Sequence, residues 1–220
     1  PLDGFVKLEL KDREDSKKYM CLYYSGPIRS AGGTGASVSV LIAEYLRKKF
    51  DIALYDPNQK EIRRSVTEVY DYHEKVTNLQ YLPSEEEVEF LASHITVQID
   101  GDPSEKFEVS NYKDLTRIGT NRIRNGFCLV MAECLCQKAP KLFSQLSKWK
   151  GTEYELENWS FLDKFVKLQK KMKAKEKTEN VDDSSKIKPD FTFIKDLVAG
   201  RPILTHPMHK GGFRLRYGRA

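Results

Sequence analysis

The feature that most constrains the fold is one apolar stretch between residues 123 and 149. A helix that is apolar over so much of its length is stable in water only when other elements cover it. Pro140 lies inside the stretch, and proline both lacks an N–H donor and clashes with the preceding helical turn. The sequence therefore predicts two buried helices that meet at Pro140. Their apolar positions include Phe127, Val130, Met131, Leu135, Leu142, Phe143 and Leu146.

Shorter patterns predict the elements around this stretch. Residues 6–10 and 19–24 alternate or run apolar on either side of a charged turn, which predicts a β-hairpin. Residues 95–99 alternate as a third strand, and the Asp-Gly-Asp-Pro run after them is a strong turn signal. With helical periodicity elsewhere, the predicted fold class is α+β, a helix-rich domain with a few short strands. The sequence also predicts a helix after residue 35, one from Asp56, one from Ser84, one from Trp159 and a brief one over residues 191–198. Residues 213–217 are predicted to form a further strand.

Capping residues define two helix starts. Asp56 is the expected N-cap of one helix, with Pro57 in the first helical position and Gln59 closing a pair that resembles a capping box. Ser84 begins a full capping box for a short helix that ends near Ser93. The helix after residue 35 is expected to bury one apolar face. That face consists of Val38, Leu41, Ile42, Tyr45 and Leu46.

Composition limits the class of protein. The chain has 220 residues, a charged fraction of 31% and a mean hydropathy of −0.57, and it contains no apolar run of the length that spans a membrane. No signal peptide opens the chain, so we expect a cytoplasmic protein. Because the chain starts at Pro1, we also expect it to be part of a longer protein. The predicted organisation is a helix-rich domain over 1–168, a lysine-rich variable linker over 169–189, and a connection over 190–220.

The segment from Gly26 to Gly35 is rich in glycine and precedes a helix. Backbone N–H groups at such a helix start can bind an anion, so Gly32, Gly33 and Thr34 are a candidate anion-binding loop. The alternative is that the glycines only permit a tight turn and close helix packing. The loop is not a P-loop, because no Gly-Lys-Ser/Thr follows, and it is not a Rossmann loop, because Val38 occupies the third glycine position.

No set of residues with catalytic chemistry is evident. The four cysteines form no Cys-x-x-Cys pair and have no zinc-type spacing with histidine, so buried free thiols are expected. Pro207 separates His206 from His209, and His73 falls on the apolar side of its helix. Two aspartates in the turn after residue 99 could bind magnesium, but turns commonly use aspartate for backbone geometry. We therefore expect no catalytic residue, no metal site and no cofactor in these residues.

Two segments are basic and contain no acidic residue, which indicates a polyanionic partner. They cover residues 115–132 and 202–220. In an extended strand, Arg214 and Arg216 share one face, while the aromatic and apolar neighbours share the other. The alternative is an ordinary edge strand, where arginines suppress aggregation. The candidate phosphate contacts are Lys210, Arg214, Arg216 and Arg219, and in second rank Arg29, Arg122 and Arg124.

Five blocks of the sequence together resemble a known family. They are GPIRSAGGT at 26–34, VTNLQYLPS at 76–84, TNRIR at 120–124, QKA at 137–139 and GGFRLRYGR at 211–219. In this order they resemble the N-terminal region of the large subunit of archaeal D-family DNA polymerases. Small departures occur at Gly35, where the family usually has alanine, and at Asn125, where glycine is usual.

The resemblance implies that these residues belong to a DNA polymerase but do not carry out nucleotidyl transfer themselves. Large subunits of this family build the polymerase centre from two double-psi β-barrels, with magnesium bound by an Asn-Ala-Asp-Phe-Asp-Gly-Asp run that these residues lack. The resemblance also implies that the 3′–5′ exonuclease belongs to a small partner subunit. The chain would then contribute scaffold and DNA contacts to a heterodimeric replicative polymerase, and its partners would be DNA, the small subunit and the catalytic core of its own subunit.

Two other hypotheses remain open at this level. The chain could be a pure scaffold whose basic segments face its own subunit or the partner subunit. It could also be an independent phosphoryl-transfer enzyme that uses the glycine-rich loop, although the family resemblance and the missing aspartate cluster disfavour this. DNA binding by the chain separates the first hypothesis from the scaffold, and stabilisation by nucleotide and magnesium would indicate the enzyme.

Overall fold

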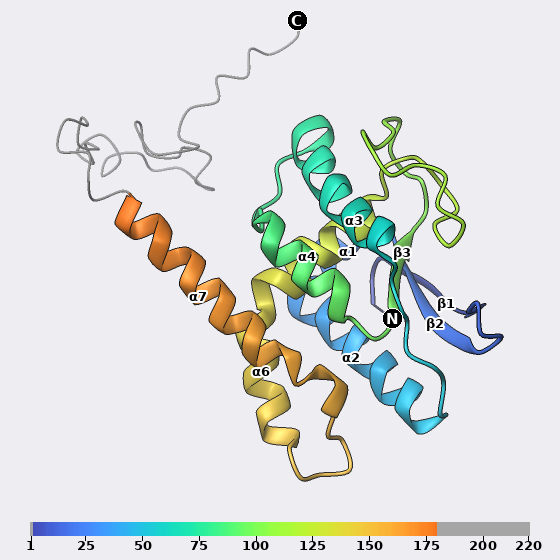
Figure 1. Ribbon diagram of the computed structural model, residues 1–220, viewed down its shortest axis with the longest axis vertical. Coiled ribbons are helices and arrows are strands. Elements are labelled where there is room, and N and C mark those ends of the chain that lie inside the picture. Colours follow the sequence, from blue (N-terminus) through green and yellow to red (C-terminus); the bar gives the residue numbers. More distant parts are fainter. Residues whose placement is uncertain (1, 180–220) are drawn as a thin grey trace, which may run out of the picture. The chain divides into compact units, whose positions relative to one another are not determined.

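The computed structural model shows a small sheet covered by helices (Figure 1), and it describes residues 2–179, with side chains through residue 174. Strand β1 (Phe5–Asp12) pairs antiparallel with β2 (Lys18–Tyr24), which pairs in parallel with β3 (Gln98–Gly101). The strand order is therefore β1-β2-β3. The helix-rich α+β class and the hairpin are confirmed. The predicted elements at 191–198 and 213–217 lie outside the described residues.

The third strand starts later than predicted. Its four residues, Gln98 to Gly101, are all buried, so Asp100 and Gly101 belong to the strand and not to the turn. Sequence patterns place aspartate in turns because an unpaired buried carboxylate is costly. Asp100 can be buried because Arg124 and Lys11 bind its two carboxylate oxygens, at 2.7 and 3.0 Å.

Helices α2 (Gly33–Lys49) and α5 (Asn125–Leu129) pack against β2 and β3, whereas β1 is largely exposed. No helix among residues 2–179 is long and apolar enough to cross a membrane. The sheet face that carries Met20 and Leu22 is buried, and helix α2 packs against β2 (Figure 1). The longer helical elements are α2 (Gly33–Lys49), α3 (Gln59–Asp71), α4 (Glu85–His94), α6 (Gln137–Trp149) and α7 (Phe161–Glu179). The shorter ones are α1 (Ile28–Ala31), η1 (Tyr72–Val76), α5 (Asn125–Leu129), η2 (Val130–Cys136) and η3 (Glu157–Trp159).

The capping box of α4 is confirmed, whereas that of α3 was predicted two residues too early. In α4 the Ser84 hydroxyl accepts from the Glu87 N–H, and the Glu87 carboxylate accepts from the Ser84 N–H. In α3 the N-cap is Asn58, whose partner is Glu61. Asp56 instead forms an ion pair with a distant arginine, a contact that local patterns do not reveal.

The buried face of helix α2 overlaps the predicted one only in part: Leu41 is buried, and Tyr45 and Leu46 pack against the core. Ile42 is 54% exposed, while Ser37 and Glu44 are buried. The Ser37 hydroxyl donates to the Cys134 carbonyl of η2 at 2.7 Å, and Glu44 receives two hydrogen bonds from Arg47. Small and paired polar residues therefore bring α2 close to η2, and apolar periodicity did not identify these polar positions.

The apolar stretch is one continuous helical run from Asn125 to Trp149, and Pro140 lies within α6. The predicted break at Pro140 is therefore wrong. The residues before α6 form η2, a π-helical segment, in which the usual hydrogen-bond ladder is already shifted. Pro140 has no N–H for the Cys136 carbonyl, four residues earlier. The side chain of Gln169 supplies this hydrogen bond instead, at 2.9 Å.

Gln169 joins three elements of the core. Its Nε2 atom donates to the Cys136 carbonyl and to Glu87 of α4 at 2.7 Å, and lies 3.3 Å from the Tyr81 hydroxyl. The side chain belongs to α7 and is buried. Helix α7 therefore continues through residue 179, and residues 169–179, which were assigned to a linker, are helical.

We predict that Gln169→Leu destabilises the fold by about 2 kcal/mol. The substitution keeps the side chain's size but leaves the Cys136 carbonyl without a donor and removes a hydrogen bond from the buried Glu87. The measurement is urea unfolding followed by circular dichroism. The exposed neighbour Lys170→Leu is the control and should change the free energy of unfolding by less than about 0.5 kcal/mol. Equal effects of the two substitutions would contradict the assignment.

Candidate nucleic-acid interface

The candidate anion-binding loop forms the start of α2. Gly32 separates α1 from α2 and has a φ of 79°, a left-handed conformation that favours glycine. The first N–H groups of any helix lack an intrahelical acceptor, and those of α2 belong to Gly33 and Thr34. No side chain caps this helix start. The loop therefore presents backbone donors and the positive end of the α2 dipole.

Close packing of α2 against η2 also explains why residue 33 is glycine. A Cβ atom at Gly33 would lie 2.8 Å from the Glu133 carbonyl oxygen of η2, too close for any side chain. The packing alternative from the sequence therefore accounts for this residue. The same close approach brings α6 to the loop. The Cε atom of Lys138 lies 3.0 Å from that Cβ position, and Lys141 donates to the Thr34 hydroxyl at 3.2 Å.

The charges around the loop are only partly balanced. Arg29 of α1 lies 3.0 Å from the Glu133 carboxylate and also donates to the Asn78 carbonyl. Lys138 and Lys141 form no ion pair with a described residue. Two cations without an acidic partner therefore stand beside the start of α2. We name Gly32, Gly33, Thr34, Lys138 and Lys141 the α2–α6 corner.

Neither Lys138 nor Lys141 was among the site residues predicted from the sequence. Lys138 belongs to the QKA block of the family resemblance, so a signal for it existed. Lys141 offered none, because its proximity to Thr34, 107 residues away, depends on how α2 packs against α6. The other predicted phosphate contacts, apart from Arg29, do not belong to this corner. Lys210, Arg214, Arg216 and Arg219 lie outside the described residues, Arg122 is exposed, and Arg124 is buried.

Arg124 occupies the centre of a buried network of charges. Its guanidinium lies 2.6 Å from Glu68 and 2.7 Å from Asp100, and only 1% of its surface is exposed. Glu68 also binds Arg64, and Asp100 also binds Lys11, each at 3.0 Å. The network connects α3, β3, β1 and the start of α5. An arginine buried in this way has a structural role, so we omit Arg124 from the DNA contacts proposed below.

Arginines also anchor the segment before α5. The guanidinium of Arg64 donates to the backbone carbonyls of Tyr112, Thr120 and Arg122. Arg117 forms ion pairs with Glu61 and with Asp56 at 2.8 Å. Residues 115–132 contain no acidic residue in sequence, but acidic residues of other segments neutralise Arg117 and Arg124 in space. Arg122 is the arginine of this segment that remains exposed.

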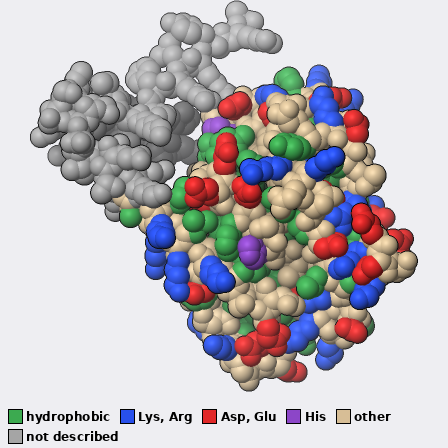
Figure 2. Space-filling view, viewed as in Figure 1, with side chains coloured by type: hydrophobic (Ala, Val, Ile, Leu, Met, Phe, Trp, Pro, Cys, Tyr) green, Lys and Arg blue, Asp and Glu red, His purple; other side chains and the backbone are tan. Residues whose placement is uncertain are grey.

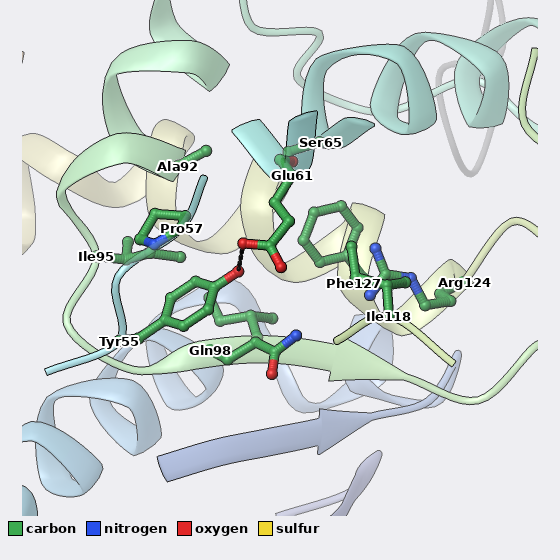
Figure 3. A pocket seen from close by; sticks show the side chains of 11 residues that line it. Tyr55, Pro57, Glu61, Ser65, Ala92, Ile95, Gln98, Ile118, Arg124 and Phe127 are labelled. Carbon is green, nitrogen blue, oxygen red and sulfur yellow. Dashed lines mark hydrogen bonds between the residues drawn. The ribbon is translucent and has the colours of Figure 1, made fainter. Parts of the chain in front are cut away.

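A small cavity lies beside this network (Figure 3). Tyr55, Glu61 and Gln98 line it with the apolar side chains of Ile118 and Phe127, and the Tyr55 hydroxyl donates to Glu61 at 3.3 Å. Its volume is about 10 Å³, which is room for one water molecule and for no substrate. The cavity is therefore part of the structural core.

The described residues offer no metal centre and no reactive thiol. No cluster of three or more His, Cys, Asp or Glu suited to a metal ion occurs within residues 2–179. Burial raises the pKa of all four thiols, to about 12 for Cys21 and Cys134. At neutral pH they are protonated and therefore weak nucleophiles. The expected free, buried cysteines are confirmed.

Two family models together cover nearly the whole chain. The model described as DNA polymerase II large subunit DP2, N-terminal, matches residues 1–168, and the model of the central domain matches residues 175–220. The boundary lies within the stretch that was assigned to a linker. Both matches define a class, the large subunits of a multisubunit DNA polymerase.

Curated relatives agree with the family models. Proteins named "DNA polymerase II large subunit" are 47% identical in Nanoarchaeum equitans, 44% in Methanothermobacter thermautotrophicus and 44% in Archaeoglobus fulgidus, each over all of this chain. The chain spans 18–20% of the length of these relatives. The chain belongs to the family of archaeal DNA polymerase II large subunits, also called the D family, and corresponds to its N-terminal region.

We predict that Arg124→Met destabilises the fold by about 3–5 kcal/mol, because it leaves Glu68 and Asp100 buried without their shared cation. The matched control is Arg122→Met, two residues away and exposed, which should cost less than about 0.5 kcal/mol. Chemical denaturation measures both. Comparable stability of the two variants would contradict the structural role of Arg124.

We also predict a specific dependence of stability on pH. Burial raises the pKa of Asp100, but Arg124 and Lys11 outweigh it, so the pKa lies below the ordinary value. The stabilisation by this carboxylate is therefore complete above about pH 4 and is lost as pH falls further. In urea unfolding, the difference in free energy between the wild type and Asp100→Asn should shrink from pH 5 to pH 3. Asp102→Asn, at an exposed position two residues further on, is the matched control and should change the free energy of unfolding by less than about 0.5 kcal/mol.

Proposed function

We propose that the chain is the N-terminal, non-catalytic part of the polymerase subunit of a replicative DNA polymerase, where it supports the catalytic core and contacts the DNA backbone. Family membership supports the polymerase setting. The observation that favours DNA contact is the α2–α6 corner, where two lysines without acidic partners stand beside free helix N–H groups. Such a site suits a phosphate oxygen and carries no information about base sequence.

The full-length protein is proposed to be a DNA-directed DNA polymerase that uses magnesium in its catalytic core. Two-metal phosphoryl transfer needs clustered carboxylates, and the acidic residues of the buried network here are instead bound to arginine and lysine. The chain by itself is therefore proposed to be inactive. Its proposed partners are DNA, the catalytic core of its own subunit, and a small subunit that carries the exonuclease.

A pure scaffold is the second candidate function. The observation that favours it is the neutralisation of arginines that the sequence suggested as phosphate contacts, since Arg29 pairs with Glu133 and Arg124 with Glu68. In that case the remaining basic residues would face protein surfaces of the same polymerase. The two candidates differ in one measurable property, the salt-dependent affinity of the chain for DNA.

We predict that the chain binds duplex and primer–template DNA weakly and independently of sequence. Each lost phosphate contact should reduce the slope of log affinity against log salt by about one unit. Lys138→Ala/Lys141→Ala and Arg214→Ala/Arg216→Ala should each reduce it by one to two units, since each removes up to two cations. The slope is measured by fluorescence anisotropy of labelled DNA at salt concentrations from about 50 to about 300 mM.

The control is Lys148→Ala/Lys150→Ala, which removes two exposed lysines at the other end of α6. It changes the net charge equally but lies outside the corner, so its slope should match that of the wild type. If the corner and arginine variants both bind DNA like the wild type at every salt concentration, these residues are not the phosphate contacts. If the wild-type chain shows no salt-dependent binding of DNA, the scaffold function replaces the proposed one.

A further inference from the structure

The charges of the described domain are distributed very unevenly. Residues 1–160 contain 22 Lys and Arg against 25 Asp and Glu, so this part of the chain is slightly acidic. Residues 161–172, which form most of α7, contain four lysines and one aspartate. Residues 1–172 are therefore neutral as a whole, because the charge of +3 on this part of α7 balances the charge of −3 on residues 1–160. A polyanion is therefore attracted more strongly to α7 than to the rest of the domain taken as a whole.

The lysines lie on the side of α7 that faces solvent. Phe165 and Gln169 are buried against α4 and η2, and Phe165 stacks on Phe90 at 5.7 Å. Lys164, Lys167 and Lys171 follow a spacing of three and four residues, so they share the opposite face. Figure 2 shows Lys and Arg side chains along the left edge of the view, where α7 lies in Figure 1.

Most of these lysines have no acidic partner. Lys167 binds Asp163 at 2.6 Å, whereas Lys164, Lys170 and Lys171 form no ion pair with a described residue and are exposed. Helical geometry places Lys164 about 10 Å from Lys171 along the axis. This length matches about three phosphate-to-phosphate intervals of one DNA strand, measured along the axis of the duplex. Gln169 and Phe165 fix the helix to the core, so Lys164 and Lys171 are held in one row, and Lys170 lies about 100° around the helix from Lys171.

From this arrangement we propose that α7 is a DNA-backbone binding surface, with Lys164, Lys170 and Lys171 as its main phosphate contacts. The proposal rests on the proposed function, because it names where the DNA of that function is bound. It assigns to α7 a role that the sequence did not suggest, since the lysine-rich residues from 169 onward had the pattern of a linker. The contacts are to phosphate, so the surface does not discriminate between base sequences.

The test is DNA binding by Lys164→Gln/Lys170→Gln/Lys171→Gln in the 220-residue chain. Glutamine has nearly the helix propensity of lysine, so α7 is retained. The matched control is Lys49→Gln/Lys60→Gln/Lys106→Gln, three exposed lysines of the acidic part that likewise form no ion pair with a described residue. Both triple variants lower the net charge by the same amount. Circular dichroism and urea unfolding confirm that both are folded.

The expected result is a loss of affinity of roughly tenfold per contact near 0.1 M salt, and a salt slope lower by two to three units, in the α7 variant alone. Equal losses in both variants would overturn the proposal, because net charge and not α7 would then control binding. Wild-type affinity in the α7 variant would overturn it while leaving the proposed function intact. A wild-type chain that binds no DNA at any salt concentration would refute both.

Discussion

The carboxylate of Glu68 is the group on which the rest of the domain depends. It is fully buried on α3 and accepts hydrogen bonds from the side chain of Arg64 and from both the backbone and side chain of Arg124. Through these arginines it fixes the segment before α5 and, by way of Asp100, the edge strand β3. Removing one member of such a network leaves another buried charge unpaired, which costs far more than a surface ion pair contributes.

The long helical run depends on a second buried polar contact. A proline within a helix normally leaves a carbonyl without its donor, and here Gln169 replaces the missing N–H. The contact also orients α7, because the same amide reaches Glu87 on α4. The continuity of the helical run from α5 to α6 and the docking of α7 are therefore coupled, because both depend on the side chain of Gln169. The docking of α7 in turn determines which of its lysines face solvent.

Charge is used in two opposite ways in this molecule. In the core, arginines from one part of the chain meet carboxylates from another, so that basic sequence segments become neutral in space. At the α2–α6 corner and along α7, by contrast, several lysines that reach solvent, among them Lys141, Lys164 and Lys171, have no acidic partner among the described residues. Lysine is strongly hydrated and suits exposed contacts, whereas the planar arginine side chain suits buried pairs. This division supports a domain that is rigid inside and basic only at selected surfaces.

Local patterns in the sequence determined much of the secondary structure. The hairpin, the capping box at Ser84 and the buried cysteines follow from periodicity, capping chemistry and burial preference, which act over a few residues. The motif blocks likewise determined the family. Only the tertiary structure decided that Pro140 lies within a helix, that Asp100 is buried and that Lys141 stands beside Thr34. Each of these depends on a partner at least 24 residues away, and single-sequence patterns carry no information about such pairings.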